Sequence, residues 1–173
     1  SDIRIKRQPY VIIPCGIAPD EPVHELFGAI RAVPEILFVM TWFAEKLPAE
    51  LRSQAPDNLL FTGFLQELEF NALFANAKAA LVLTTREGTQ PSGAAEAISL
   101  GIPLILSELA TTRRLYDDAP VYVQNNVNSI ADGIREALQD QDSLSDAIAG
   151  LRESLVGDAQ TQIDHVKSIL GSR

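Results

Sequence analysis

A chain of 173 residues is long enough for one ordinary domain, and on folding it buries about 70% of the surface that its unfolded form exposes. Its formal net charge of -9 argues against a dedicated nucleic-acid-binding protein, because phosphate contacts require a basic face. No apolar run approaches the ~20 residues of a membrane span. The single cysteine, Cys15, cannot form an internal disulfide, which fits the reducing environment of the cytoplasm.

Short apolar runs alternate with segments of helical length along most of the chain. The predicted strands cover residues 10–15, 36–41, 59–62, 79–84, 103–107 and 121–123. The predicted helices cover residues 23–32, 48–54, 65–76, 93–100, 110–116 and 129–139. Most of the strands are continuously apolar, which is typical of strands buried on both faces of a parallel sheet. The alternation therefore predicts an α/β fold: a doubly wound, Rossmann-like parallel sheet of about six strands with right-handed crossovers and C-terminal helices.

Apolar side chains at helical spacing predict which faces of the helices are buried. In the helix expected at 65–76 the stripe consists of Leu65, Leu68, Ala72 and Ala75. After Gln139 two further stripes follow: Ile148, Leu151 and Leu155, then Ile163, Val166 and Ile169. We expect Gly157-Asp158 to break or bend the segment between these two stripes. We interpret 140–173 as a helical extension of a single lobe, 1–173, and expect it to lie on this domain or on a missing neighbour.

The stretch TTREGTQPSGAAEAISLGIPLIL, residues 84–106, joins a strand to a helix of small residues. In open α/β sheets, ligands bind beyond the carboxyl ends of the strands. A helix that begins near Ser92 or Gly93 presents free backbone N–H groups and a partial positive charge, which suit a phosphate. Gly101 should end this helix in a left-handed conformation. The residues expected to hold the phosphate are Gly88, Thr89, Gln90, Ser92 and Gly93.

Two acidic residues, Glu87 and Glu96, flank this turn. A carboxylate accepts paired hydrogen bonds from vicinal hydroxyls such as those of ribose and pyranose rings. Two acids on either side of a phosphate site therefore suit a nucleotide-sugar diphosphate. Simpler roles are equally open: Glu96 would complement the helix dipole, worth ~0.3–1 kcal/mol, and Glu87 would be a solvated loop charge.

The run LLFTGFLQ…LFANAKAALVLTTREGTQPSGAAEAISLGIPLILSE resembles the donor-binding lobe of the family 4 retaining glycosyltransferases. The resemblance spans residues 10–139 and is carried by several elements in the same order. These elements are NLLFTGF at 58–64, LFANAKA at 73–79, Glu87-Gly88, Glu96-Ala97, Gly101 and Pro103.

The resemblance implies a C-terminal, nucleotide-sugar-binding lobe of a two-lobed enzyme. Such an enzyme transfers a hexosyl unit from a nucleotide diphosphate to a sugar or lipid-linked acceptor, with retention and without a required metal. The resemblance assigns the donor ribose to Glu96, the donor sugar hydroxyls and catalysis to Glu87, and the border of the base to Phe64 and Leu65. It assigns the diphosphate to backbone amides of residues 89–92. The acceptor lobe would be missing, so the isolated chain would be inactive; its location would be cytoplasmic, with any membrane contact made through that lobe.

Two departures from the family pattern concern the diphosphate site. Eight residues separate Glu87 from Glu96, whereas the family has seven. Gly16, which we include in the donor site, and Glu21 stand where the family has two cations. A diphosphate without them loses charge-assisted hydrogen bonds worth ~1.5–3 kcal/mol each. Arg86, Arg113 and Arg114 are candidate substitutes or, alternatively, surface charges.

The lost cations favour one alternative function, a degenerate lobe that binds a sugar or a partner protein without catalysis. A sugar-nucleotide epimerase of related two-lobed fold is a second alternative. His24 and His165 have no ligand spacing, so no metal site is expected. Trp42 either packs at the rim of the cleft or stacks on a base.

Overall fold

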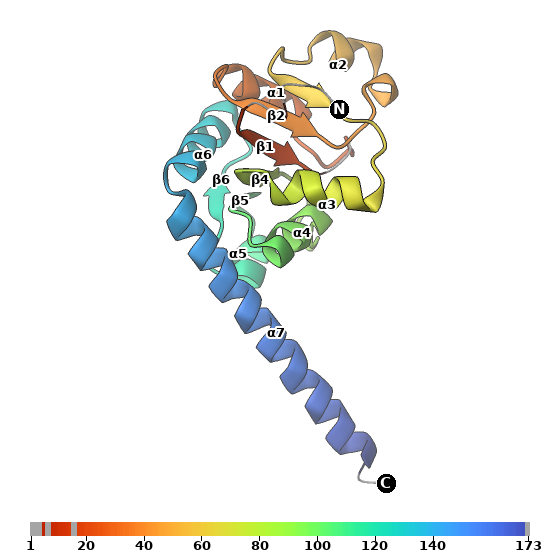
Figure 1. Ribbon diagram of the computed structural model, residues 1–173, viewed down its shortest axis with the longest axis vertical. Coiled ribbons are helices and arrows are strands. Elements are labelled where there is room, and N and C mark those ends of the chain that lie inside the picture. Colours follow the sequence, from red (N-terminus) through yellow and green to blue (C-terminus); the bar gives the residue numbers. More distant parts are fainter. Residues whose placement is uncertain (1–4, 6–7, 15–16, 172–173) are drawn as a thin grey trace.

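The fold is a six-stranded parallel sheet between two layers of helices (Figure 1). The computed structural model describes residues 5, 8–14 and 17–171, so Cys15 and Gly16 lie outside the described residues. The strands are β1 (Tyr10–Ile13), β2 (Leu37–Met40), β3 (Leu59–Phe61), β4 (Ala79–Val82), β5 (Leu104–Ser107) and β6 (Val121–Val123). Their order in the sheet is β3-β2-β1-β4-β5-β6, and every neighbouring pair is parallel. The predicted doubly wound sheet of about six strands is confirmed.

The helices are α1 (Val23–Arg31), α2 (Ala49–Ser53), α3 (Glu67–Ala75), α4 (Ser92–Leu100), α5 (Ala110–Tyr116), α6 (Val127–Gln139) and α7 (Gln141–Gly171), with a short 3-10 turn at Ala44–Lys46. Residues of α1 and α6 form one core cluster with the sheet, while residues of α3, α4, α5 and the start of α7 form the other. Strand order reverses between β1 and β4, so the chain leaves a crevice beyond the carboxyl ends of these two strands.

Helix α3 buries a different face from the one that the sequence predicts. Phe74 is fully buried, and Phe70 packs on it edge to face with ring centroids 5.6 Å apart. By contrast, Leu68 is 84% exposed, and Ala72 and Ala75 are exposed as well. The predicted stripe is wrong because the two aromatic rings remove more apolar surface from water than the leucine and alanines on the other side.

Helix α7 runs unbroken from Gln141 to Gly171, so the expected break at Gly157-Asp158 is wrong. A single glycine in a helix costs only ~1 kcal/mol, which the surrounding helix-forming residues offset. Ile148 and Leu151 are buried against the domain, and beyond them the helix projects away from it (Figure 1). The exposed apolar side chains on this projecting part are Leu155, Val156, Ile163, Val166, Ile169 and Leu170. None of the described helices combines the length and the apolarity that crossing a membrane requires.

Candidate functional site

A cavity of about 160 Å³ lies at the crevice, between the loop after β1 and the start of α4. From the loop after β1 it is lined by Ala18, Asp20 and Glu21. From β4, the loop after it and the start of α4 it is lined by Val82, Leu83, Thr84, Thr89, Pro91, Ser92 and Gly93. Thr89, Ser92 and Gly93, which the sequence assigns to the phosphate, therefore share one cavity.

A hydrogen-bond network centred on Thr84 fixes the loops around this cavity. The Thr84 hydroxyl donates to Asp20 Oδ2 at 2.9 Å, and the Thr84 backbone N–H donates to Ser107 Oγ at 3.0 Å. Ser107 in turn donates to Asn125 Oδ1 at 2.7 Å, and Asn125 Nδ2 donates back to the Thr84 carbonyl at 2.9 Å. Thr84 and Ser107 are buried. The loops after β1, β4 and β6 and the end of β5 are thus held together. Sequence reasoning missed this role of Asp20, Ser107 and Asn125, because no local pattern links these distant residues.

Helix α4 begins at Ser92, as predicted, and ends at Gly101 in the left-handed conformation with a φ of 70°. Its N-cap, Pro91, makes no side-chain capping hydrogen bond. A Cβ added to Gly93 would lie 2.7 Å from Pro14 Cγ and 3.4 Å from the Pro14 carbonyl oxygen. Glycine at this position therefore lets α4 approach the end of β1 closely, and the first turn of the helix faces the cavity.

The charge of the cavity differs from that of an ordinary diphosphate site. Asp20 and Glu21 both line it, and none of its described lining residues is a cation. Arg113, a candidate substitute, is held elsewhere: its guanidinium pairs with Glu108 at 2.7 Å and Asp118 at 2.9 Å and stacks 3.8 Å from the Tyr122 ring centroid. The described lining is therefore acidic, and the positive end of the α4 dipole lies at the same cavity.

The Glu87 carboxylate caps the start of α5. Glu87 Oε1 accepts from the Ala110 backbone N–H at 3.0 Å. Glu87 Oε2 accepts from the Thr111 backbone N–H at 3.2 Å and from the Thr111 hydroxyl at 2.8 Å. The Thr111 hydroxyl and these backbone N–H groups hold the pKa of Glu87 below its ordinary value. Glu87 is thus exposed in its loop, and these hydrogen bonds orient its carboxylate and favour its ionised form.

Glu96 lies on α4, outside its first turn. Its Oε2 atom is buried and has no hydrogen-bond partner within the described part of the chain. Burial raises the pKa of Glu96 above its ordinary value. A dipole interaction falls off within the first helical turn, so it does not account for this acid.

The sequence profile of the family described as "Glycosyl transferases group 1" matches residues 45–153, which is more than half of the chain. The chain belongs to this family. The matched segment contains both Glu87 and Glu96 and the whole of α4 and α5. A comparison with curated protein sequences finds no match.

Solved structures of glycosyltransferases share the fold at low sequence identity. The catalytic domain of cholesterol-α-glucosyltransferase from Helicobacter pylori superposes with a TM-score of 0.69 at 17% identity, over 87% of this chain and 99% of that one. Sucrose-phosphate synthase from Thermosynechococcus elongatus gives a TM-score of 0.70 at 18% identity, over 96% of this chain and 47% of that one. The trehalose-6-phosphate phosphatase N-terminal domain from Candida albicans gives 0.65 at 15% identity, over 87% and 39%. The chain thus spans less than half of two of these three structures.

Four other predicted site residues are not part of the lining of the cavity at α4: Phe64, Leu65, Gly88 and Gln90. Gln90 lines a groove of about 250 Å³ between α4 and α7, where it faces the buried Tyr116 hydroxyl. Phe64 is 71% exposed in the loop between β3 and α3, and Leu65 follows it, partly buried. Gly88 has a φ of 75°, which favours glycine in this turn, and an added Cβ would meet no protein atom within 4 Å. Gly16 lies outside the described residues.

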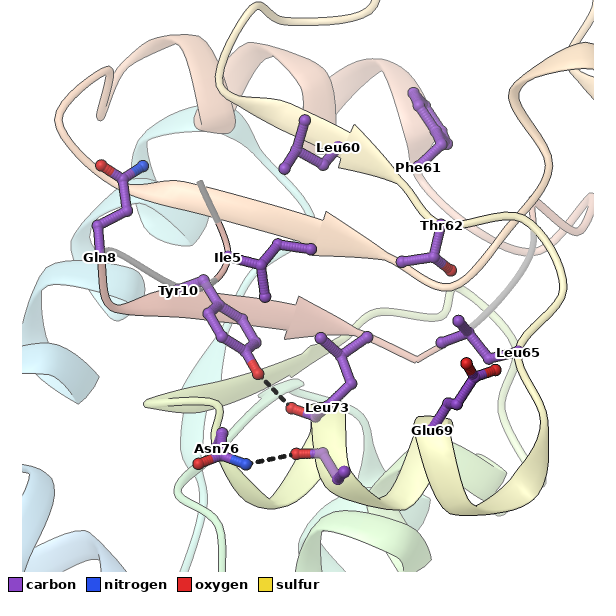
Figure 2. A pocket seen from close by; sticks show the side chains of 11 residues that line it. Ile5, Gln8, Tyr10, Leu60, Phe61, Thr62, Leu65, Glu69, Leu73 and Asn76 are labelled. Carbon is purple, nitrogen blue, oxygen red and sulfur yellow. Dashed lines mark hydrogen bonds between the residues drawn. The ribbon is translucent and has the colours of Figure 1, made fainter. Parts of the chain in front are cut away.

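The largest cavity, about 720 Å³, lies elsewhere, between the β1–β3 side of the sheet and α3 (Figure 2). Of the predicted site residues, Leu65 lines it. Several of its polar groups are already satisfied by the α3 backbone: Tyr10 Oη donates to the Leu73 carbonyl at 2.5 Å and Asn76 Nδ2 to the Ala72 carbonyl at 2.6 Å (Figure 2). Gln8, Thr62 and Glu69 add further polar groups to its lining. The cavity at α4 is the better candidate because it lies beyond the carboxyl ends of the strands, at the point where the strand order reverses.

Trp42 packs against the core on the α1 side, as one of the two predicted roles requires. Its ring lies edge to face with Phe43, and Lys46 Nζ is 5.4 Å from its centroid. Among the described residues, no three His, Cys, Asp or Glu side chains gather as a set of metal ligands.

Proposed function

We propose that this chain, a member of the glycosyl transferases group 1 family, is the C-terminal, donor-binding lobe of a two-lobed glycosyltransferase. The enzyme would be a retaining one of the family 4 type. The observation that carries the proposal is the buried, unpaired Oε2 of Glu96 on the helix that starts at the cavity. Two vicinal ribose hydroxyls would supply the donors that this carboxylate lacks. Binding would thereby remove the cost of leaving a buried acceptor unsatisfied.

The remaining groups suit the other parts of a nucleotide-sugar diphosphate. The backbone N–H groups at Ser92 and Gly93, with the Thr89 and Ser92 side chains, would hold the diphosphate and stabilise it as it leaves. Glu87, ionised and held by α5, would contact hydroxyls of the donor sugar. Phe64, with 71% of its surface exposed, would be covered by the base. We propose a hexosyl transfer to a sugar or lipid-linked acceptor in the cytoplasm, without a required metal and with the acceptor bound by another part of the protein.

Two structural neighbours narrow the choice of donors to test first. They are UDP-forming trehalose-phosphate synthase from Burkholderia xenovorans and cholesterol-α-glucosyltransferase from Helicobacter pylori. UDP-glucose is accordingly the first donor to try on this chain, followed by the GDP and ADP conjugates.

The acidic lining of the cavity favours a second candidate, a lobe that binds a sugar or partner without transfer. Asp20 and Glu21 would repel a diphosphate that the helix dipole alone must attract. The two candidates differ in their expected affinity for a free hexose. A non-catalytic sugar-binding lobe would bind a free hexose as tightly as the nucleotide conjugate of that hexose.

Calorimetric titration of UDP, GDP, ADP and their glucose conjugates tests the proposal. We expect one nucleotide series to bind, and Glu96→Ala to weaken that binding about 10-fold or more through loss of a charge-assisted hydrogen bond. The matched control is Glu153→Ala, an exposed glutamate on α7. If no nucleotide binds to this chain or to the longer protein, the donor-lobe proposal is wrong.

A further inference from the structure

The turn that carries Glu87 is tied to α5 through one side chain. The Thr111 hydroxyl donates to Glu87 Oε2 at 2.8 Å and accepts from the Gly88 backbone N–H at 3.0 Å. It therefore bridges the carboxylate and the backbone of the residue that follows it. Within the described residues, Thr111 is the only side chain that hydrogen-bonds to Glu87.

The platform that presents Thr111 is itself fixed to the sheet. The Thr112 hydroxyl, fully buried, donates to the Ser107 carbonyl at the end of β5 at 2.8 Å. The next residue, Arg113, pairs with Glu108 at 2.7 Å and stacks on Tyr122 of β6. These contacts set the start of α5 relative to the strand ends, so the Thr111 hydroxyl occupies a defined position in front of Glu87.

A glutamate on an exposed loop ordinarily samples many rotamers, and a ligand that needs one of them must overcome that entropy. Glu87 is exposed, yet both of its carboxylate oxygens are engaged on the side that faces α5. Glu87 Oε2 already accepts two of these hydrogen bonds, whereas Oε1 accepts one and keeps a lone pair that can accept a hydrogen bond from a sugar hydroxyl. The arrangement orients the acid before any ligand arrives and keeps it ionised.

We propose that Thr111 is a positioning residue for the donor sugar: its hydroxyl, with the N–H groups of Ala110 and Thr111, presets the Glu87 carboxylate. Only the contact of Glu87 with the donor sugar, the second half of this inference, rests on the proposed function. Its first half, that Thr111 holds Glu87, concerns the protein alone.

The test compares Thr111→Val, which removes the hydroxyl at nearly equal volume, with Thr111→Ser, which keeps it. Carbon-13 NMR titration of the Glu87 carboxyl should show its pKa moving up toward the ordinary value in Thr111→Val and staying low in Thr111→Ser. Thr161→Val, on the exposed part of α7, is the control and should leave this pKa unchanged. An unchanged Glu87 pKa in Thr111→Val overturns the proposal.

The second measurement uses the nucleoside diphosphate that binds the wild-type chain, alone and as its glucose conjugate. Thr111→Val should reduce the extra affinity that the glucose adds by about 5-fold and leave the affinity of the free diphosphate unchanged; Thr111→Ser should restore it. An equal fall for both ligands would show a merely structural role and overturn the proposal. If no nucleotide binds the wild type, the proposed function fails instead, and the NMR titration still decides whether Thr111 holds Glu87. Should Thr111→Val not fold, Thr111→Ala gives the same two readouts.

Discussion

The pKa values of Glu87 and Glu96 shift in opposite directions, although only eight residues lie between the two acids in the sequence. Hydrogen bonds from α5 lower the pKa of Glu87, so its stabilising effect is present above the ordinary carboxyl pKa and is lost as the pH falls through the lowered value. Burial raises the pKa of Glu96, so the folded protein holds the proton on this carboxyl more tightly than the unfolded chain does. Ionisation of Glu96 above the ordinary carboxyl pKa therefore lowers the stability of the folded state. One acid supports the fold at neutral pH, whereas the other opposes it.

A substitution at Glu96 tests this cost. Glu96→Gln should raise the free energy of unfolding at neutral pH by about 0.5 kcal/mol, because an amide does not have to be buried as a charge. The gain should shrink as the pH falls toward the ordinary carboxyl pKa, where the wild-type side chain takes up its proton. Urea unfolding of both proteins at neutral and at mildly acidic pH measures the difference. A less stable variant at neutral pH would contradict the assignment.

The charge of the cavity at α4 gives a second prediction at the residue scale. Replacing Glu21 by lysine removes a carboxylate from the cavity lining and adds a cation there. Glu21→Lys should therefore raise the affinity for the bound nucleoside diphosphate about 10-fold, an effect that salt weakens. Glu153→Lys changes the net charge equally on the exposed surface of α7 and should leave the affinity unchanged. Equal gains for both variants would point to net charge and not to the cavity.

At the scale of the elements, a glycine-to-alanine substitution should change the free energy of unfolding in opposite directions in helices α6 and α7. A Cβ at Gly133 of α6 would lie 2.3 Å from Val123 Cγ1, whereas a Cβ at Gly150 of α7 would meet nothing within 4 Å. Gly133→Ala should therefore destabilise the domain by about 1–3 kcal/mol through overpacking. Gly150→Ala should stabilise it by about 0.5–1 kcal/mol through lower chain entropy. Urea unfolding followed by circular dichroism checks both signs.

The sequence predicted the elements whose signal is local and missed what depends on distant partners. Continuous apolar runs placed all six strands, and the glycine and small residues after β4 placed the start and end of α4. The buried face of α3 could not be predicted from the local sequence. This helix carries two apolar stripes, and its packing against the sheet determines which of them is buried. In the site, the bond from Thr84 to Asp20 joins residues 64 positions apart, and that from Thr111 to Glu87 joins residues 24 apart. Neither pairing has a pattern that spacing alone reveals.

At the scale of the whole molecule, the projecting part of α7 is the feature that the domain itself does not explain. Its apolar stripe continues well past the residues that pack on the domain, and Ile163, Val166 and Ile169 are each about half exposed. Such a stripe is typical of a helix that covers another apolar surface. This accords with a chain that spans less than half of several structural neighbours.

A truncation after Val156 tests how far α7 contributes to the isolated domain. Ile148 and Leu151 remain in the shortened chain, and these are the buried residues of the helix. An uncovered helix of about 15 residues is marginal in water, so the removed part should add little to folding. We expect the free energy of unfolding to stay within about 0.5 kcal/mol of the full chain, and backbone amides after Val156 in the full chain to exchange with solvent far faster than those of β4 and β5. A loss of more than about 1 kcal/mol, or slow exchange along the distal helix, would mean that this part of α7 is covered in the isolated chain, by the domain or by a second copy.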